Sequence, residues 1–311
     1  MWFKQIQLFQ LKPTTYNIET LTKQIEELSF IPCFPSTPSS IGWVSPIDED
    51  NAPIIRSMNG YIMLCMQVEE KILPATVIRQ ELDAKVKRME TLDSRKIRSK
   101  EKQSLKDEVI ATLLPRAFSK LTKIYGYIDT KNHWLVLNTV STKMAEQFIS
   151  LFKKSIAEEI QPYDIQVFTD TLTSWVKTQQ YPTEFAIENA CILQDPAHET
   201  RMIRCSHQDL FAQPIQALLN DGCEVIQLAL SWQDRINFVL NKLFIIRSIS
   251  FQDEIHEQVK EMEPETKLQR FDADFYIMTE LFHLMLNELI TAFTAPKKLT
   301  LVNKDNMKAV A

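Results

Sequence analysis

The sequence predicts an α+β protein made of two mixed α/β halves, with a helical arm inserted into the first half. Three observations lead to this prediction. Apolar segments of strand length occur on both sides of a central, charge-dense stretch, that stretch contains no glycine, and a long amphipathic helix lies near the C-terminus. We assign residues 1–73 and 124–165 to a central α+β domain, 74–123 to the arm, 166–296 to a second α+β domain, and 297–311 to a flexible tail.

The first half contains strand-like and helix-like segments. The strand-like segments are rich in aromatic, β-branched and other apolar residues; they are 2–11, 61–68 and a hairpin over 124–138 with its turn at 129–132. The helix-like segments place apolar residues three or four positions apart; they are 18–28 and 141–154. Residues 32–46 are rich in proline and serine and are expected to form a loop.

The arm is predicted to contain two helices, over residues 75–93 and 101–118. Pro115 lies inside the second helix and is expected to kink or end it. Apolar residues recur every four positions in this helix and form a stripe beside its charges. The stripe consists of Leu105, Val109 and Leu113.

Predicted helices and strands alternate less regularly in the second half. A helix is predicted over residues 169–177, and a long helix over 265–291, where apolar residues alternate in steps of three and four. Five further segments are of strand length and composition. They are 184–193, 199–205, 223–230, 235–240 and 243–249.

Charge is distributed unevenly along the chain. The whole sequence has a formal charge of −5, yet residues 79–123 contain 13 basic and seven acidic residues, a net charge of +6 that leaves −11 for the remainder. A concentrated basic cluster can bind a phosphate backbone by releasing its condensed counterions. The predicted DNA-binding residues are Arg79, Lys85, Lys87, Arg88, Arg95, Lys96, Arg98, Lys100, Lys102, Lys106 and Arg116.

Several interpretations of the basic cluster stay open from the residues alone. Helices of mixed charge are often solvated faces stabilised by ion pairs between residues four apart. The arm would then be a docking surface for another protein, without functional DNA binding. A nucleic-acid enzyme with dispersed metal ligands is a third interpretation. No recognition helix and no aromatic stacking strand is evident, so DNA contact is expected at the backbone, without sequence preference.

No motif for catalysis or for a cofactor is recognisable. The four glycines are too scattered for a phosphate-binding loop, and no H-E-x-x-H or G-x-S-x-G string occurs. The five histidines include no pair at the spacing of a helical zinc site. The chain is therefore expected to be no enzyme and to hold no metal or cofactor.

Two groups of acidic residues have a structural interpretation that outweighs metal binding. Asp272 and Asp274 are two positions apart in a predicted helix, so their side chains point in different directions. Residues 48–50 form an acidic run that is expected to be solvated in a loop. His283 lies in the apolar C-terminal helix and is expected to be a packed or partly exposed residue.

The sequence favours a cytoplasmic protein. The five cysteines are scattered singly, which is typical of reduced thiols and not of a disulfide framework. The N-terminus lacks the layout of a signal peptide, and no apolar run approaches the roughly 20 residues needed to cross a bilayer. No membrane partner is expected.

Several strings, taken together, resemble the RdgC family of bacterial recombination-associated proteins, and they occur in the family's order over nearly the whole chain. They are Trp2-Phe3-Lys4, Gly42-Trp43-Val44, Glu69-Glu70-Lys71-Ile72-Leu73-Pro74, Ser104-Leu105-Lys106-Asp107-Glu108-Val109, Leu113-Leu114-Pro115-Arg116-Ala117-Phe118-Ser119, Gln208-Asp209-Leu210, Leu228-Ala229-Leu230-Ser231-Trp232 and Gln269-Arg270-Phe271-Asp272-Ala273-Asp274-Phe275.

The resemblance implies a nucleoid-associated protein that binds duplex DNA without sequence specificity. In this family, two horseshoe-shaped subunits meet at both ends and form a ring around the duplex, and coating the DNA restrains RecA-promoted strand exchange. A helix of about 19 residues is roughly 28 Å long, a useful length for spanning such a ring. Basic side chains on the inner face of the arm would meet phosphates, and its apolar stripe would meet the other subunit.

The resemblance also implies roles for single residues. Arg95 and Arg116 match basic residues of the ring lining. Phe118 matches an aromatic residue at a subunit contact, although it could also be an ordinary core residue just beyond Pro115. His207 and Gln208 lie in a segment that matches the other subunit contact.

The chain departs from the family pattern near that second contact. His207 and Cys223 stand where relatives tend to have lysine. Both changes remove fixed positive charge, although His207 could regain charge at low pH. DNA binding by this half is therefore expected to be weakened.

Overall fold

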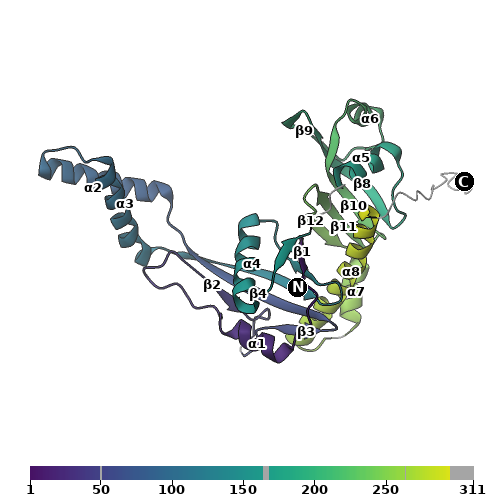
Figure 1. Ribbon diagram of the computed structural model, residues 1–311, viewed down its shortest axis with the longest axis horizontal. Helices are drawn as coiled ribbons and strands as arrows, with labels where there is room; N and C mark the ends of the chain where they lie inside the picture. The colour runs from purple at the N-terminus through teal and green to yellow at the C-terminus, as the bar shows by residue number, and fades with distance from the viewer. Residues whose placement is uncertain (50, 164–167, 263, 295–311) are drawn as a thin grey trace, which may run out of the picture.

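The computed structural model describes residues 1–49, 51–163, 168–262 and 264–294. Within these residues the chain forms two antiparallel sheets with helices packed around them, which confirms the predicted α+β class. Figure 1 shows the helical arm leaving one end of the first sheet, with the second sheet beyond the other end. The predicted tail and the predicted domain boundary at 165 lie outside the described residues.

Seven of the described strands form the first sheet, in the order β2-β4-β5-β6-β1-β7, with β3 also paired to β4. They are β1 (Gln7–Leu11), β2 (Ser39–Val44), β3 (Arg56–Met58), β4 (Tyr61–Lys71), β5 (Ser119–Asp129), β6 (Trp134–Leu137) and β7 (Ile160–Pro162). The helices of this half are α1 (Ile18–Glu26) and α4 (Thr142–Ile156). Both helices and the hairpin turn lie where the sequence predicted them.

Strand β4 is apolar along most of its length because both of its faces are covered. Alternate side chains of a strand point to opposite faces. Ile62 and Leu64 belong to a core shared with α1 and α4, whereas Tyr61 and Met63 belong to a second core shared with the long C-terminal helix. A strand buried between two layers reads in sequence as one continuous apolar run.

The loop predicted over residues 32–46 is wrong, because it contains strand β2. Trp43 is 1% exposed and packs edge-on against Phe148, with ring centroids 5.0 Å apart, which buries this segment despite its serines. A Cβ atom at Gly42 would lie 2.4 Å from the Cα atom of Phe30. Only glycine therefore allows the chain at residues 29–30 to cross β2 so closely.

Two predicted strand boundaries are also wrong. The first strand begins at Gln7 and not at residue 2, and β5 begins at Ser119, five residues inside the predicted arm. Residues 119–123 are mostly polar and none is buried, yet they continue the ladder with β4 down to the pair Lys71–Ser119. Pairing with a neighbouring strand, which composition does not report, decides their structure.

The second sheet has the order β12-β11-β10-β8-β9 and confirms all five predicted strands of this half, with β12 beginning a few residues later than expected. Its strands are β8 (Phe185–Asp195), β9 (His198–Ser206), β10 (Glu224–Trp232), β11 (Ile236–Asn241) and β12 (Ile246–Phe251). The helices are α5 (Phe168–Thr178), α6 (Gln213–Asn220), α7 (Asp253–Glu261) and α8 (Lys267–Thr294). Helices α6 and α7 were not predicted.

Helix α8 joins the two halves into one core. The buried face of α8 lies in a hydrophobic core that includes Tyr127 of the first sheet and Phe238 of the second. Near its start, Asp272 receives two hydrogen bonds from Arg56, while Asp274 binds the amino terminus and the Trp2 indole. The two carboxylates thus have separate structural partners, as predicted.

A polar cluster fixes the β5–β6 turn against the middle of α8. The Asp129 carboxylate is nearly inaccessible and accepts hydrogen bonds from the backbone N–H groups of Lys131 and Asn132 at 2.9 and 3.1 Å. Its Oδ2 also lies 3.0 Å from Nδ1 of His283 on α8. His283 is therefore a packed, partly exposed residue, as predicted.

The acidic run at residues 48–50 is solvated at the two positions that the structure describes. Asp48 pairs with Lys123 on β5, but its own side chain is 80% exposed, and Glu49 is also exposed. Asp50 lies outside the described residues. The loop prediction for this run is confirmed for Asp48 and Glu49.

Candidate nucleic-acid interface

The arm is a helical hairpin carried on the paired ends of strands β4 and β5. It consists of α2 (Ala75–Asp93), α3 (Ser99–Leu113) and a short 3-10 turn, η1 (Leu114–Arg116). Helix α3 ends at Leu113, before Pro115, because proline cannot supply the next helical N–H. This confirms that Pro115 ends the helix and corrects its predicted bound at residue 118. Figure 1 shows this hairpin projecting away from both sheets.

The apolar stripe of α3 packs against the facing helix of the arm. Leu105 and Val109 on α3 are each 6% exposed, and Leu82 on the facing helix α2 is 7% exposed. Helices α2 and α3 pack against each other, so these side chains form the small core of the hairpin. Two of the three stripe residues, Leu105 and Val109, are thus covered within the arm, and only the half-buried Leu113 leaves apolar surface for the expected contact with another subunit.

Carboxylates order the turn between the two arm helices. Ser94 adopts a left-handed conformation with φ of 49° and ends α2. Glu90 then accepts a hydrogen bond from the backbone N–H of Ile97 at 3.0 Å, and Glu101 accepts one from that of Arg98 at 3.1 Å. The most basic part of the chain is thereby held in a defined turn.

The predicted DNA-binding residues are almost all on the arm surface: ten are exposed, and Lys85 is half-buried. Three of the eleven are engaged within the arm, since Lys85 pairs with Glu108, Lys102 with Asp83, and Arg95 with Glu101 and Asp93. The other eight form no ion pair among the residues that the structure describes. They are Arg79, Lys87, Arg88, Lys96, Arg98, Lys100, Lys106 and Arg116.

Arg95 is the most strongly engaged of these cations. Its two terminal nitrogens donate to the two carboxylate oxygens of Glu101, each at 2.9 Å. This fork, together with the backbone N–H of Arg98, lowers the pKa of Glu101 to about 2. Arg95 would have to exchange a carboxylate for a phosphate to contact DNA, whereas Arg116 would not.

Phe118 lies at the base of the arm and is 85% exposed. The alternative that it is a core residue is therefore wrong. Its carbonyl accepts a hydrogen bond from the N–H of Ile72 at 2.7 Å, so these two residues stand side by side on the extended ends of β5 and β4. Ile72 is itself 50% exposed, and together they form an apolar surface that was not predicted.

The structure places His207 and Gln208 far from the arm, in the second half of the molecule. Both are exposed and follow directly after β9, the edge strand of the second sheet. The N–H of Gln208 donates to the carbonyl of Asn189 at 3.2 Å, and His207 has a φ of 55°. The predicted site residues thus form two groups, one on the arm and one beside β9, on opposite sides of the molecule in Figure 1.

The cysteines are free thiols, in agreement with the sequence. Cys191 and Cys205 face each other across β8 and β9, where burial and the neighbouring thiol raise the pKa of Cys191 to about 12. Cys223 is half-buried and follows Gly222, whose φ is 96°.

The described residues include neither a candidate metal site nor a membrane-spanning helix. No three of their His, Cys, Asp and Glu side chains are grouped closely enough to hold a metal ion. None of their helices is both long and apolar enough to cross a membrane.

Comparison with known proteins gives a consistent family. A family model described as "Putative exonuclease, RdgC" matches residues 1–295. Proteins named "Recombination-associated protein RdgC" from Yersinia enterocolitica, Yersinia pestis and Yersinia pseudotuberculosis are each 36% identical to this chain over 295 residues. Each match covers 94% of this chain and 97% of the relative.

Proposed function

This chain belongs to the RdgC family, and from that premise we propose that it is a sequence-nonspecific duplex DNA-binding protein that acts in recombination. In this proposal two copies form a ring-shaped homodimer that encircles DNA. Coating the duplex restrains RecA-promoted strand exchange and keeps the protein on the nucleoid in the cytoplasm. The activity is binding, with no bond cleaved.

The observation that supports DNA binding best is the set of eight unpaired cations on the arm. Residues outside 79–123 carry a net charge of −11, yet these cations are exposed on one projecting hairpin, where none of them forms an ion pair with a described carboxylate. Such a surface attracts phosphates and releases counterions, and it offers no means of reading bases.

The two exposed contact regions support a homodimer. Phe118 and Ile72 present apolar surface at the arm, and Gln208 follows an edge strand at the other end of the molecule. Exposed apolar patches and sheet edges are surfaces that proteins commonly cover by association. Two copies that met at both regions would enclose a central opening.

Salt-titrated DNA binding tests the location of the DNA contact. The double variant Lys96→Glu/Lys100→Glu is compared with the double variant Lys23→Glu/Lys267→Glu. The second variant changes the net charge by the same amount, at exposed sites on α1 and α8. The arm variant is expected to lose at least about tenfold in affinity, with a slope of log affinity against log salt that is smaller by about two. Equal losses in the two variants would contradict the proposal.

The ring is tested separately by sedimentation and by DNA topology. The wild-type protein is expected to sediment as a dimer and to dissociate far more slowly from closed circular DNA than from linear DNA of the same sequence. Phe118→Ser removes an exposed side chain and should leave folding intact while weakening the dimer. Equal dissociation from circles and linear DNA would remove the ring from the proposal.

The exposed Phe118 also fits a second candidate function, in which the arm docks another protein without functional DNA binding. The same experiments separate the two. Salt-independent or undetectable DNA binding by the wild-type protein would favour docking.

The family model's description calls for a direct test of nuclease activity. End-labelled linear DNA incubated with the protein and Mg²⁺ or Mn²⁺ is expected to stay intact. Release of labelled nucleotides would contradict a purely binding role.

A further inference from the structure

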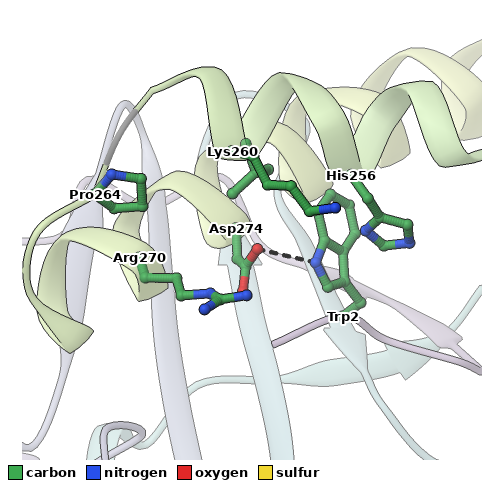
Figure 2. A pocket seen from close by; sticks show the side chains of 7 residues that line it. Trp2, His256, Lys260, Pro264, Arg270 and Asp274 are labelled. Atoms are coloured by element: carbon green, nitrogen blue, oxygen red, sulfur yellow. Dashed lines mark hydrogen bonds between the residues drawn. The ribbon is translucent and has the colours of Figure 1, made fainter.

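A hollow at the junction of the two halves carries cationic and aromatic side chains that the proposed function does not use (Figure 2). It lies between α7, α8 and the first residues of the chain, and its volume of about 680 Å³ lies in the ~300–1,000 Å³ range of small-ligand sites. The residues that matter here are Trp2, His256, Val259, Lys260, Arg270 and Asp274.

The two permanent cations of this hollow are uncommitted. Lys260 on α7 and Arg270 on α8 are exposed, and neither forms an ion pair with any residue that the structure describes. Figure 2 shows both side chains reaching into the space around Trp2 and Asp274. They are free to bind an anion from two sides.

The carboxylate in the lining does not neutralise them. Asp274 Oδ2 binds the amino terminus of Met1, and its Oδ1 accepts a hydrogen bond from the Trp2 indole at 2.9 Å. The Asp274 side chain is only 13% exposed. The amino terminus therefore compensates the charge of Asp274, and the positive potential of Lys260 and Arg270 is available to a ligand.

The same hollow has a rigid aromatic wall. Trp2 is half-buried and is held by Phe251 and His256, with ring centroids 4.6 and 4.9 Å away. Val259 adds buried apolar surface beside it. A fixed indole next to cations can hold a planar base while the cations hold its phosphate.

We propose that this hollow binds a 5′-phosphorylated nucleoside, with Lys260 and Arg270 on the phosphate and with Trp2 and Val259 against the base. A free mononucleotide and the terminal nucleotide of a DNA strand both offer this chemistry. The hollow is separate from the arm and is built by different residues, so the proposal stands independently of DNA binding by the arm.

Calorimetric titration of the full-length protein with deoxyadenosine monophosphate tests the site. One molecule is expected to bind per chain, more tightly than deoxyadenosine or inorganic phosphate alone. Lys260→Ala with Arg270→Ala should weaken binding at least about tenfold, because two charge-assisted contacts are lost. Both residues are exposed, so the variant should fold, and circular dichroism checks this. Lys267→Ala, an exposed lysine at the start of α8 and outside the hollow, should change nothing.

Short oligonucleotides distinguish the two sources of the ligand. A 5′-phosphorylated trinucleotide that binds better than its 5′-hydroxyl twin identifies a strand end, and equal weak binding of the two identifies the free nucleotide. No binding of deoxyadenosine monophosphate would overturn the proposal. So would an affinity equal to that of inorganic phosphate, or one unchanged in the double variant.

Discussion

Helix α8 and the arm are both built of long helices, but the two regions are stabilised differently. Helix α8 buries ten of its 28 residues and contacts both sheets. Helix α2 of the arm buries only Leu82, and α3 buries only Leu105 and Val109. The comparison shows that α8 depends on the global core, whereas the arm is a locally stabilised carrier of surface charge.

The largest expected effect comes from removing a core side chain of α8. Phe282 is fully buried and packs near Phe3 and Phe251, with ring centroids 6.4 and 5.6 Å away. Phe282→Ala should reduce the free energy of unfolding by about 3–5 kcal/mol, because it leaves a cavity. Leu105→Ala, the matched change in the arm, should chiefly accelerate hydrogen exchange of arm amides. If urea unfolding shows equal global losses, the two regions do not differ as described.

A smaller effect is expected where α8 holds the β5–β6 turn. Asp129→Ala removes the acceptor of two turn N–H groups and the partner of His283, and should cost about 1–3 kcal/mol in unfolding free energy. Glu280→Ala removes the partly exposed pair with Lys131 and should cost less than about 1 kcal/mol. Equal costs, measured by urea unfolding, would argue against the buried cluster as a junction.

The smallest effect is expected at the arm turn, and it depends on pH. The folded-state pKa of Glu101 is lowered to about 2, below its ordinary value, so ionised Glu101 favours the folded turn at neutral pH. That contribution is lost as the pH falls from the ordinary pKa of a glutamate towards the folded-state pKa of about 2. Glu101→Gln should therefore accelerate amide exchange near Arg98 at neutral pH, and the difference from wild type should shrink in acid. A difference that persists at pH 2 would exclude this cause.

Sequence composition and periodicity were sufficient for elements whose own residues carry a clear helix or strand pattern. Helices α2 and α8 and the strands of the second sheet belong to this group. It failed where a distant neighbour decides the structure: β2 forms because Trp43 packs on Phe148, and β5 begins early because Ser119 pairs with Lys71.

The candidate site could be predicted only in part for a related reason. A count of charges locates the basic segment, but it does not show that Arg95 forms an ion pair with Glu101 while Lys96 stays unpaired. It also does not show that Leu105 is covered by the facing helix, or that Phe118 has no cover at all. These are properties of pairwise geometry, which a single sequence does not report.

The way the arm joins the body has a consequence for how such chains can diverge. The arm leaves β4 after Lys71 and returns at Ser119, and these two residues are direct partners in the antiparallel ladder. Adjacent strands lie only about 5 Å apart, the span that a short turn bridges. An insertion or deletion between these two points therefore leaves the register of the sheet unchanged. The arm can therefore change in length or in its charged residues among relatives while the body keeps the same fold.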